Sequence, residues 1–273
     1  MLVARIVFLG LFNLVALFWI NRTRINPNMA QSANHPALKE LRHRPWPLPK
    51  KRPLLSQVWQ NLLFIHWEVS LKQVQAAVPK TLEIDTYDGK AWIAIVPFDM
   101  KKVTLNGIPP ISALSDFPEI NVRTYVKHKG KPGVWFFSLD VPSKIAVWIA
   151  QRFFHLPYRY AHIEVIERDN AIYYQHKMGK SAFTAHYKPI RVAPVSETSF
   201  ETWATERYCL YCKSKKGHLY RTEVQHQKWP LQQAEIDIQT NTLLDTWDLG
   251  LRHPSVLFSK HLDVLAYAPE RLG

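Results

Sequence analysis

The sequence predicts an α+β domain built on one large, mostly antiparallel sheet that is curved or closed. Strand-like segments follow one another through short turns, and only a few helical segments come between them. The 19 prolines suit many strands joined by loops, whereas 9 glycines are few for a nucleotide-binding fold built on glycine turns. A hydrophobic content of 47%, with 10 Trp, 11 Tyr and 13 Phe, is ample for a packed core.

The first elements can be placed from local patterns. An apolar run at 62–69 predicts a strand, and Ser70 with Gln73 forms a capping-box pattern that should open a helix ending at Pro79. The segment 91–98 is apolar on both faces, which predicts a strand that is buried on both sides. Further strands are expected at 119–128, 134–140, 160–167, 172–178, 182–187, 208–213, 219–226 and 255–268, and further helices at 143–154 and 198–206.

In the segment 115–126, a turn at Asp116 and Pro118 leads into strict two-residue alternation over 119–126. One interpretation is an outer strand with a solvated polar face. The other is a cavity wall that presents an acid and a base to a ligand, and the sequence alone leaves both open. The polar face comprises Glu119, Asn121, Arg123 and Tyr125, and the other face comprises Ile120, Val122, Thr124 and Val126.

The N-terminus contains an apolar run over 6–20, interrupted by Gly10 and Asn13. It is marginally long enough for a transmembrane helix, and the basic residues that follow predict a membrane-anchored domain on the cytoplasmic side. The alternative is that 1–28 is an over-extended reading frame and that the chain starts at Met29. The expected organisation is an anchor helix and tail at 1–28, a basic Pro-rich linker at 29–53, and a single domain at 54–273.

The net charge is +13, which would attract polyanions such as nucleic acid or anionic lipid. The basic clusters at 127–131 and 213–221 fall on expected hairpin tips, where solvated charge is ordinary, so no specific nucleic-acid partner is expected. No metal or cofactor is predicted. Cys209 and Cys212 point to opposite faces of their strand, although a zinc site with His218 and His226 stays an alternative.

Scattered motifs resemble those of the YqjF-like domain of unknown function, within the acetoacetate-decarboxylase-like superfamily. The resemblance covers residues 44–272 and does not extend to 1–30. It implies a cone-like, mostly antiparallel β-barrel or double sheet, flanked by a few helices and enclosing a cavity. The motifs are Arg44–Pro47, Ile65–Trp67, Asp88–Trp92, Val96–Phe98, Asp116–Val126, Leu156–Tyr160, Glu206–Tyr208, His226–Gln232, His253–Pro254, Asp263–Leu265 and Pro269–Arg271.

The superfamily's decarboxylases carry a Schiff-base lysine in a Gly-x-Pro-Lys-Lys pattern. The similar segment of this chain ends in Tyr158 and Arg159, so Tyr158 stands where that lysine is expected. A tyrosine cannot form an imine, which argues against covalent decarboxylation. Glu119 resembles the acidic residue opposite the lysine.

The sequence therefore predicts a cavity that binds or acts on a small organic anion, for example as a lyase or hydratase without Schiff-base chemistry. Glu119 is the candidate catalytic acid or base. The candidate ligand-binding residues are His66, Arg123, Tyr158 and Arg159, and the arginines would grip the anion. The alternative is a non-enzymatic basic module that docks on anionic membrane or nucleic acid.

Overall fold

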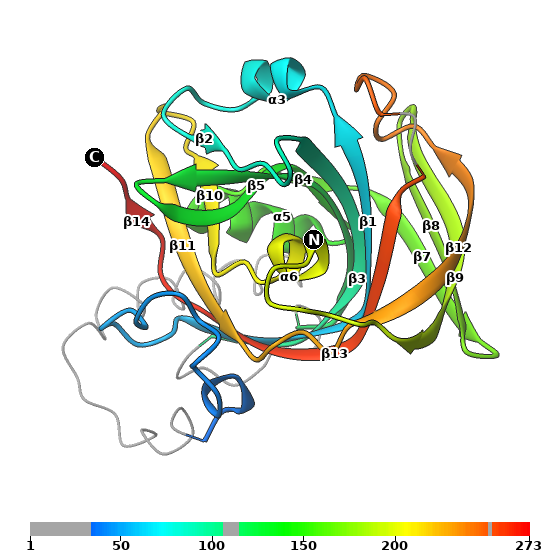
Figure 1. Ribbon diagram of the computed structural model, residues 1–273, viewed down its shortest axis with the longest axis horizontal. Helices are drawn as coiled ribbons and strands as arrows, with labels where there is room; N and C mark the ends of the chain where they lie inside the picture. Colours follow the sequence, from blue (N-terminus) through cyan, green and yellow to red (C-terminus); the bar gives the residue numbers. More distant parts are fainter. Residues whose placement is uncertain (1–33, 106–114, 251–252) are drawn as a thin grey trace, which may run out of the picture. The chain divides into compact units, whose positions relative to one another are not determined.

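A computed structural model describes residues 34–105, 115–250 and 253–273 of the chain. Within the compact unit Pro36–Gly273, seven strands pair edge to edge, and the last pairs with the first, so that the sheet closes into a ring (Figure 1). The order around the ring is β11 (Leu219–His226), β10 (Cys209–Lys213), β5 (Lys131–Val141), β4 (Phe117–His128), β3 (Ala91–Leu105), β1 (Leu55–Val69) and β13 (Ser255–Ala266).

Beyond β13 the sheet continues into four antiparallel strands that we call the side sheet, which lies outside the ring near β1 and β3 (Figure 1). The predicted large, curved and mostly antiparallel sheet is therefore confirmed. It is a mixed sheet, because β5 pairs in parallel with β10 and with β6 (Tyr158–Tyr160). The side sheet comprises β12 (Gln232–Asn241), β9 (Ser181–Val192), β8 (Ala171–Met178) and β7 (His162–Arg168).

Side-chain alternation gives the ring two different faces. On β1, Leu63 and Ile65 point outward and pack with buried side chains of the side sheet, such as Tyr174. On the same strand, Leu62 and Phe64 point inward and join a second core inside the ring. Both faces of these strands are thus buried, as the apolar pattern at 91–98 predicted for β3.

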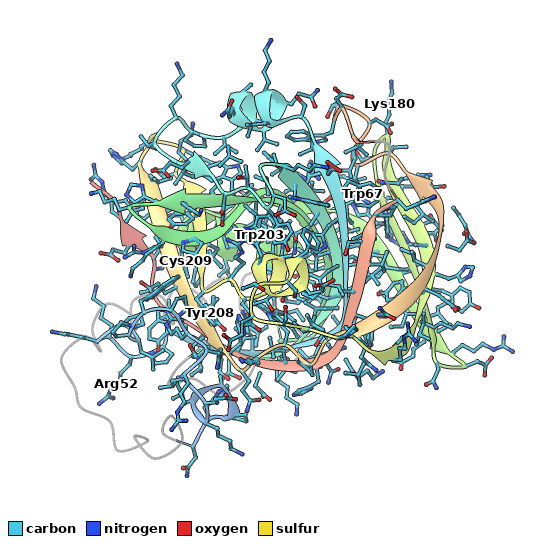
Figure 2. The ribbon with its side chains drawn as sticks, viewed as in Figure 1. Arg52, Trp67, Lys180, Trp203, Tyr208 and Cys209 are labelled. Carbon is cyan, nitrogen blue, oxygen red and sulfur yellow. The ribbon has the colours of Figure 1, made fainter. Side chains whose placement is uncertain are left out.

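Helices cover the two ends of the ring interior. The helix α6 (Phe200–Thr205) lies inside the ring in the view of Figure 1, and Trp203 sits near the centre of that view (Figure 2). The helix α5 (Lys144–Ile149) and the π-helical turn η3 (Ala150–Phe154) pack near the other end, against Phe117 and Phe136. Short elements complete the fold: η2 (Pro36–Leu38), α3 (Leu71–Ala77), β2 (Glu83–Ile84) and β14 (Glu270–Arg271).

The predicted helices are present, and two of the three carry a side-chain cap. Ser143 and Ser199 accept hydrogen bonds from backbone N–H groups of the helices that they precede. Ser70 precedes α3 but makes no side-chain capping bond, so the capping box is absent although the helix is present.

The prediction of a transmembrane helix has to be corrected. In the part of the chain that the structure describes, no helix is long and apolar enough to cross a membrane. The segment 1–28, to which that prediction was assigned, lies outside the described residues.

Candidate functional site

Strand register brings His66 and Arg123 to the same level inside the ring. His66 on β1 pairs with Ala94 on β3, and Ala94 pairs with Arg123 on β4. The side chains of His66 and Arg123 therefore lie on either side of the Ala94 methyl group. The usual strand spacing puts the Cα atoms of His66 and Arg123 about 10 Å apart. The small side chain of Ala94 leaves room between them.

Arg123 has no ion-pair partner among the described residues. Its guanidinium carbon lies 5.3 Å from the centre of the Phe64 ring and 5.8 Å from that of Tyr125. Its Nε is buried and has no hydrogen-bond acceptor. A buried cationic donor without an acceptor is costly, so this guanidinium is poised for an anionic group.

His66 is fully buried beside Arg123. Its Nε2 lies 2.6 Å from the Tyr125 hydroxyl oxygen, and its ring meets the edge of Phe200 on α6. Burial, together with the nearby charge of Arg123, holds the pKa of His66 well below its ordinary value. His66 is therefore neutral at neutral pH and can exchange a hydrogen bond without adding charge.

Glu119 lies four residues before Arg123 on the same face of β4. Its carboxylate accepts a hydrogen bond of 2.6 Å from the Tyr158 hydroxyl and a longer one of 3.5 Å from the Asn121 amide. Burial raises the pKa of Glu119 to about 7, and these hydrogen bonds only partly offset that effect. A carboxyl group with this pKa can give or take a proton near neutral pH.

Tyr158 on β6 supplies the donor that orients Glu119. Its burial and the neighbouring carboxylate raise its pKa well above the ordinary value, so it stays a phenol and donates. Between Glu119 and Arg123, the buried Oδ1 of Asn121 has no hydrogen-bond partner. The face therefore carries an acid, an amide and a cation in sequence along about 13 Å of strand.

Arg159 lies apart from this group. It follows Tyr158 on β6 and so points to the other face, where its Nε and Nη2 donate to Asp140 at 2.6 and 2.8 Å. His176 of the side sheet also contacts Asp140, at 2.9 Å. Of the predicted site residues, the structure thus brings Glu119, His66, Arg123 and Tyr158 to the ring interior and places Arg159 outside it.

The sequence analysis missed a second cation next to this site. Arg207, which follows α6, lies over the ring of Tyr125, with its guanidinium carbon 4.9 Å from the ring centre. It forms a buried ion pair with Asp85, 122 positions away in the sequence. The motif Glu206–Tyr208 pointed to this segment, but nothing local indicates which acid Arg207 meets.

The remaining candidates lie elsewhere. Cys209 and Cys212 are both buried and free, and the Cys212 thiol lies 3.2 Å from the carbonyl oxygen of Phe154. No group of His, Cys, Asp and Glu side chains within the described ranges could hold a metal ion.

Solved structures share this architecture at low sequence identity. Acetoacetate decarboxylase from Legionella pneumophila superposes with a TM-score of 0.61 and 12% identity, covering 91% of this chain and 98% of that chain. The enduracididine biosynthesis enzyme MppR complexed with pyruvate gives 0.59 and 10%, covering 82% and 92%. An acetoacetate decarboxylase-like enzyme from Sphingomonas wittichii RW1 gives 0.56 and 12%, covering 82% and 94%. These likenesses establish the fold.

Sequence comparison identifies the family. The uncharacterised protein YqjF of Bacillus subtilis (strain 168) is 41% identical over 218 residues, which is 78% of this chain and 90% of that protein. Residues 56–263 match the DUF2071 family, which is described as an uncharacterised conserved protein. The chain therefore belongs to the DUF2071 family, whose fold resembles that of acetoacetate decarboxylase.

Proposed function

We propose that the ring interior binds a small organic anion and that Glu119 exchanges a proton with it, without a covalent imine. The observation that carries the proposal is Arg123, a cation inside the ring that has no carboxylate partner in the described residues and an Nε without an acceptor. A carboxylate ligand would satisfy both its charge and its donors.

The fold neighbours support an organic acid as the ligand. One of them is named as an acetoacetate decarboxylase, and another is complexed with pyruvate. Both of those names describe short oxo-carboxylic acids as substrate or ligand. A short oxo acid would span part of the distance of about 13 Å between the Cα atoms of Arg123 and Glu119.

The chemistry differs from that of a Schiff-base enzyme. No lysine is among the buried residues of the described chain, and Tyr158 occupies the position where the resemblance places the lysine. With the anion on Arg123, the rest of the ligand extends past Asn121 toward Glu119. Glu119 then serves as general acid or base, as lyase and hydratase reactions require.

The test is ligand binding to the full chain, measured by thermal shift and calorimetry with pyruvate and other short 2-oxo and 3-oxo carboxylates. Arg123→Met should weaken binding at least tenfold, because it removes the charge but keeps most of the side-chain volume. Arg123→Lys should restore part of it, since the charge returns without the planar fork. Unchanged affinity in Arg123→Met would overturn the proposal.

Two controls test the two parts of the proposal, which are the position of the anion site and the absence of an imine. Arg159→Gln removes an arginine that lies outside the ring interior, so binding should stay within twofold of the parent. Borohydride treatment with the bound oxo acid should leave the protein mass unchanged. A covalent adduct would show that a lysine outside the expected position performs imine chemistry.

A further inference from the structure

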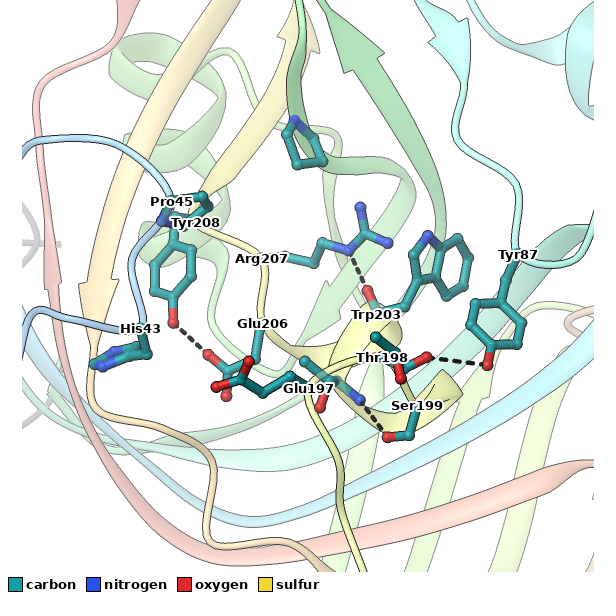
Figure 3. A pocket seen from close by; sticks show the side chains of 12 residues that line it. His43, Pro45, Tyr87, Glu197, Thr198, Ser199, Trp203, Glu206, Arg207 and Tyr208 are labelled. Carbon is teal, nitrogen blue, oxygen red and sulfur yellow. Dashed lines mark hydrogen bonds between the residues drawn. The ribbon is translucent and has the colours of Figure 1, made fainter.

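A separate pocket opens beside α6, and the proposed function makes no use of it. It encloses about 350 Å³, a volume at the small end of the range for small-molecule sites. Figure 3 shows α6 and the segment before it on one side and the segment around His43 on the other. The lining residues used below are Tyr87, Glu197, Trp203, Glu206, Arg207 and Tyr208.

One part of the pocket holds donors without acceptors. Arg207 is 7% exposed, and it lies with its guanidinium extended toward Trp203 (Figure 3). Its Nη1 donates to Asp85, and its Nε donates to the Trp203 carbonyl oxygen at 2.5 Å. Its Nη2 and the indole Nε1 of Trp203 are buried and have no partner. Both residues line the pocket, so acceptor atoms of a ligand bound there would satisfy these two donors.

Another part of the pocket presents carboxylates. Glu206 accepts from the Tyr208 hydroxyl and from the backbone N–H of Trp229, at 3.1 Å for the latter. Both donors are neutral, and Glu206 takes part in no ion pair among the described residues. Glu197 is exposed and takes part in no ion pair within the described ranges. The two acids therefore favour a cationic group in the same pocket.

The walls between these groups are aromatic. Tyr87 lies 5.6 Å from Trp203 between ring centres, and Tyr208 lines the pocket beside Glu206. Aromatic faces pack a short apolar body, and they also attract an ammonium group. A molecule that carries a carboxylate and an ammonium on a short body would satisfy every group described.

We propose that this pocket binds a free amino acid or a similar small amino-carboxylate. The ligand's carboxylate accepts hydrogen bonds from Arg207 Nη2 and Trp203 Nε1, and its ammonium lies against Glu197 and Glu206. The inference is independent of the proposed function, because it uses none of the residues assigned to the ring interior. The two sites are neighbours, because the ring centre of Trp203, which lines the pocket, lies 4.5 Å from that of Tyr125, the hydrogen-bond partner of His66.

The experiment screens the common amino acids against the full chain by thermal shift, and calorimetry then gives the dissociation constant of each hit. For a hit, the amide analogue lacks the carboxylate charge, and the analogue with hydroxyl in place of the amine lacks the ammonium. Each analogue should bind at least tenfold more weakly. Binding that is indifferent to both changes would overturn the proposal, as would the absence of any stabilising amino acid at 10 mM, roughly the weak limit for a specific small ligand.

Two variants test the residues without disturbing the Arg207–Asp85 pair. Trp203→Phe keeps the ring packing but removes the unpartnered donor, and Glu197→Gln changes an exposed side chain. Each should weaken the hit at least fivefold with little change in the melting temperature of the free protein. Glu235→Gln, an exposed acid on the side sheet, is the matched control and should bind normally.

The experiments can overturn either proposal without overturning the other. Arg123→Met should lose oxo-acid binding and keep amino-acid binding. If Arg123→Met instead abolished amino-acid binding while Trp203→Phe and Glu197→Gln retained it, the amino acid would bind in the ring interior. That result would overturn the pocket proposal and leave the proposed function standing.

Discussion

Glu119 and Asp140 are buried carboxylates on neighbouring strands, yet they lie in opposite electrostatic surroundings. Glu119 faces the ring interior and receives hydrogen bonds only from neutral groups, so burial dominates and its pKa rises to about 7. Asp140 lies on the outer face, between the ring and the side sheet. Burial would raise its pKa too, but the hydrogen bonds from His176 and Arg159 outweigh that effect and lower it.

The comparison separates a structural acid from an acid that is available for chemistry. Asp140 joins three strands, since Arg159 comes from β6 and His176 from β8. Its charge is compensated within the protein. Glu119 has no cationic partner among the described residues, and Arg123 lies four residues further along the same face of β4. A ligand can change the protonation of Glu119, whereas Asp140 is committed to holding the side sheet against the ring.

The largest expected effect is on Asp140. Asp140→Asn should lower the free energy of unfolding by about 3–5 kcal/mol, because it removes the buried carboxylate that the Arg159 guanidinium and the His176 ring both contact. Urea denaturation of the full chain measures this. Asp237→Asn, an exposed acid on the side sheet, should change the free energy by no more than about 0.5 kcal/mol. Similar values for the two variants would remove the distinction between the carboxylates.

The second-largest expected effect is the change in folding stability with pH that Glu119 causes. Its folded pKa of about 7 lies above the ordinary value of 4.5, so the folded state holds the extra proton between these values. Stability should therefore fall as pH rises from about 4.5 to about 7, by roughly 3 kcal/mol from this group.

Glu119→Gln should abolish that decline, and chemical unfolding at several pH values checks it. The exposed Glu164→Gln should leave the decline in place. Asp140 makes stability depend on pH in the opposite direction. Its lowered pKa contributes stability at neutral pH that is lost only as pH falls below about 3.8. A decline that persists in Glu119→Gln would contradict the assignment to this residue.

The smallest expected effect is on Arg159. Its side chain is 41% exposed, so Arg159→Gln should cost only about 1 kcal/mol of unfolding free energy, while His176 keeps Asp140 in place. Oxo-acid affinity should not change. A tenfold loss of affinity would return Arg159 to the binding residues that the sequence analysis expected and would blur the contrast between the two faces.

The sequence predicts well which residues of β4 lie on the face at the site. It places candidate residues from other strands less well. The alternation at 119–125 requires only local chain geometry, and the structure confirms Glu119, Asn121, Arg123 and Tyr125 on one face. Arg159 could not be placed in the same way, because its face depends on a parallel pairing of β6 with β5. The strand at 232–241 was missed, although Ala234, Ile236 and Ile238 alternate there with Glu235 and Asp237 as in a half-buried strand.

The pocket residues were harder still to foresee. Arg207 meets Asp85 only because β2 and the end of α6 come together in the folded ring. The orphan donors on Arg207 and Trp203 become visible only when every neighbour has been placed. Sequence patterns predict which residues lie on one face of a strand. Register and tertiary packing decide which of these faces lie against one another.

The closure of the ring constrains how the chain can fold. β1 and β13 are paired along most of their length, although about 200 residues separate them in the sequence. During synthesis, one edge of β1 therefore has no native partner until almost the whole chain has been made. Contacts of such separation slow folding and leave strand edges exposed meanwhile. Of the seven ring strands, β13 is thus made last and closes the ring, and a chain shortened before β13 would retain an open, aggregation-prone sheet.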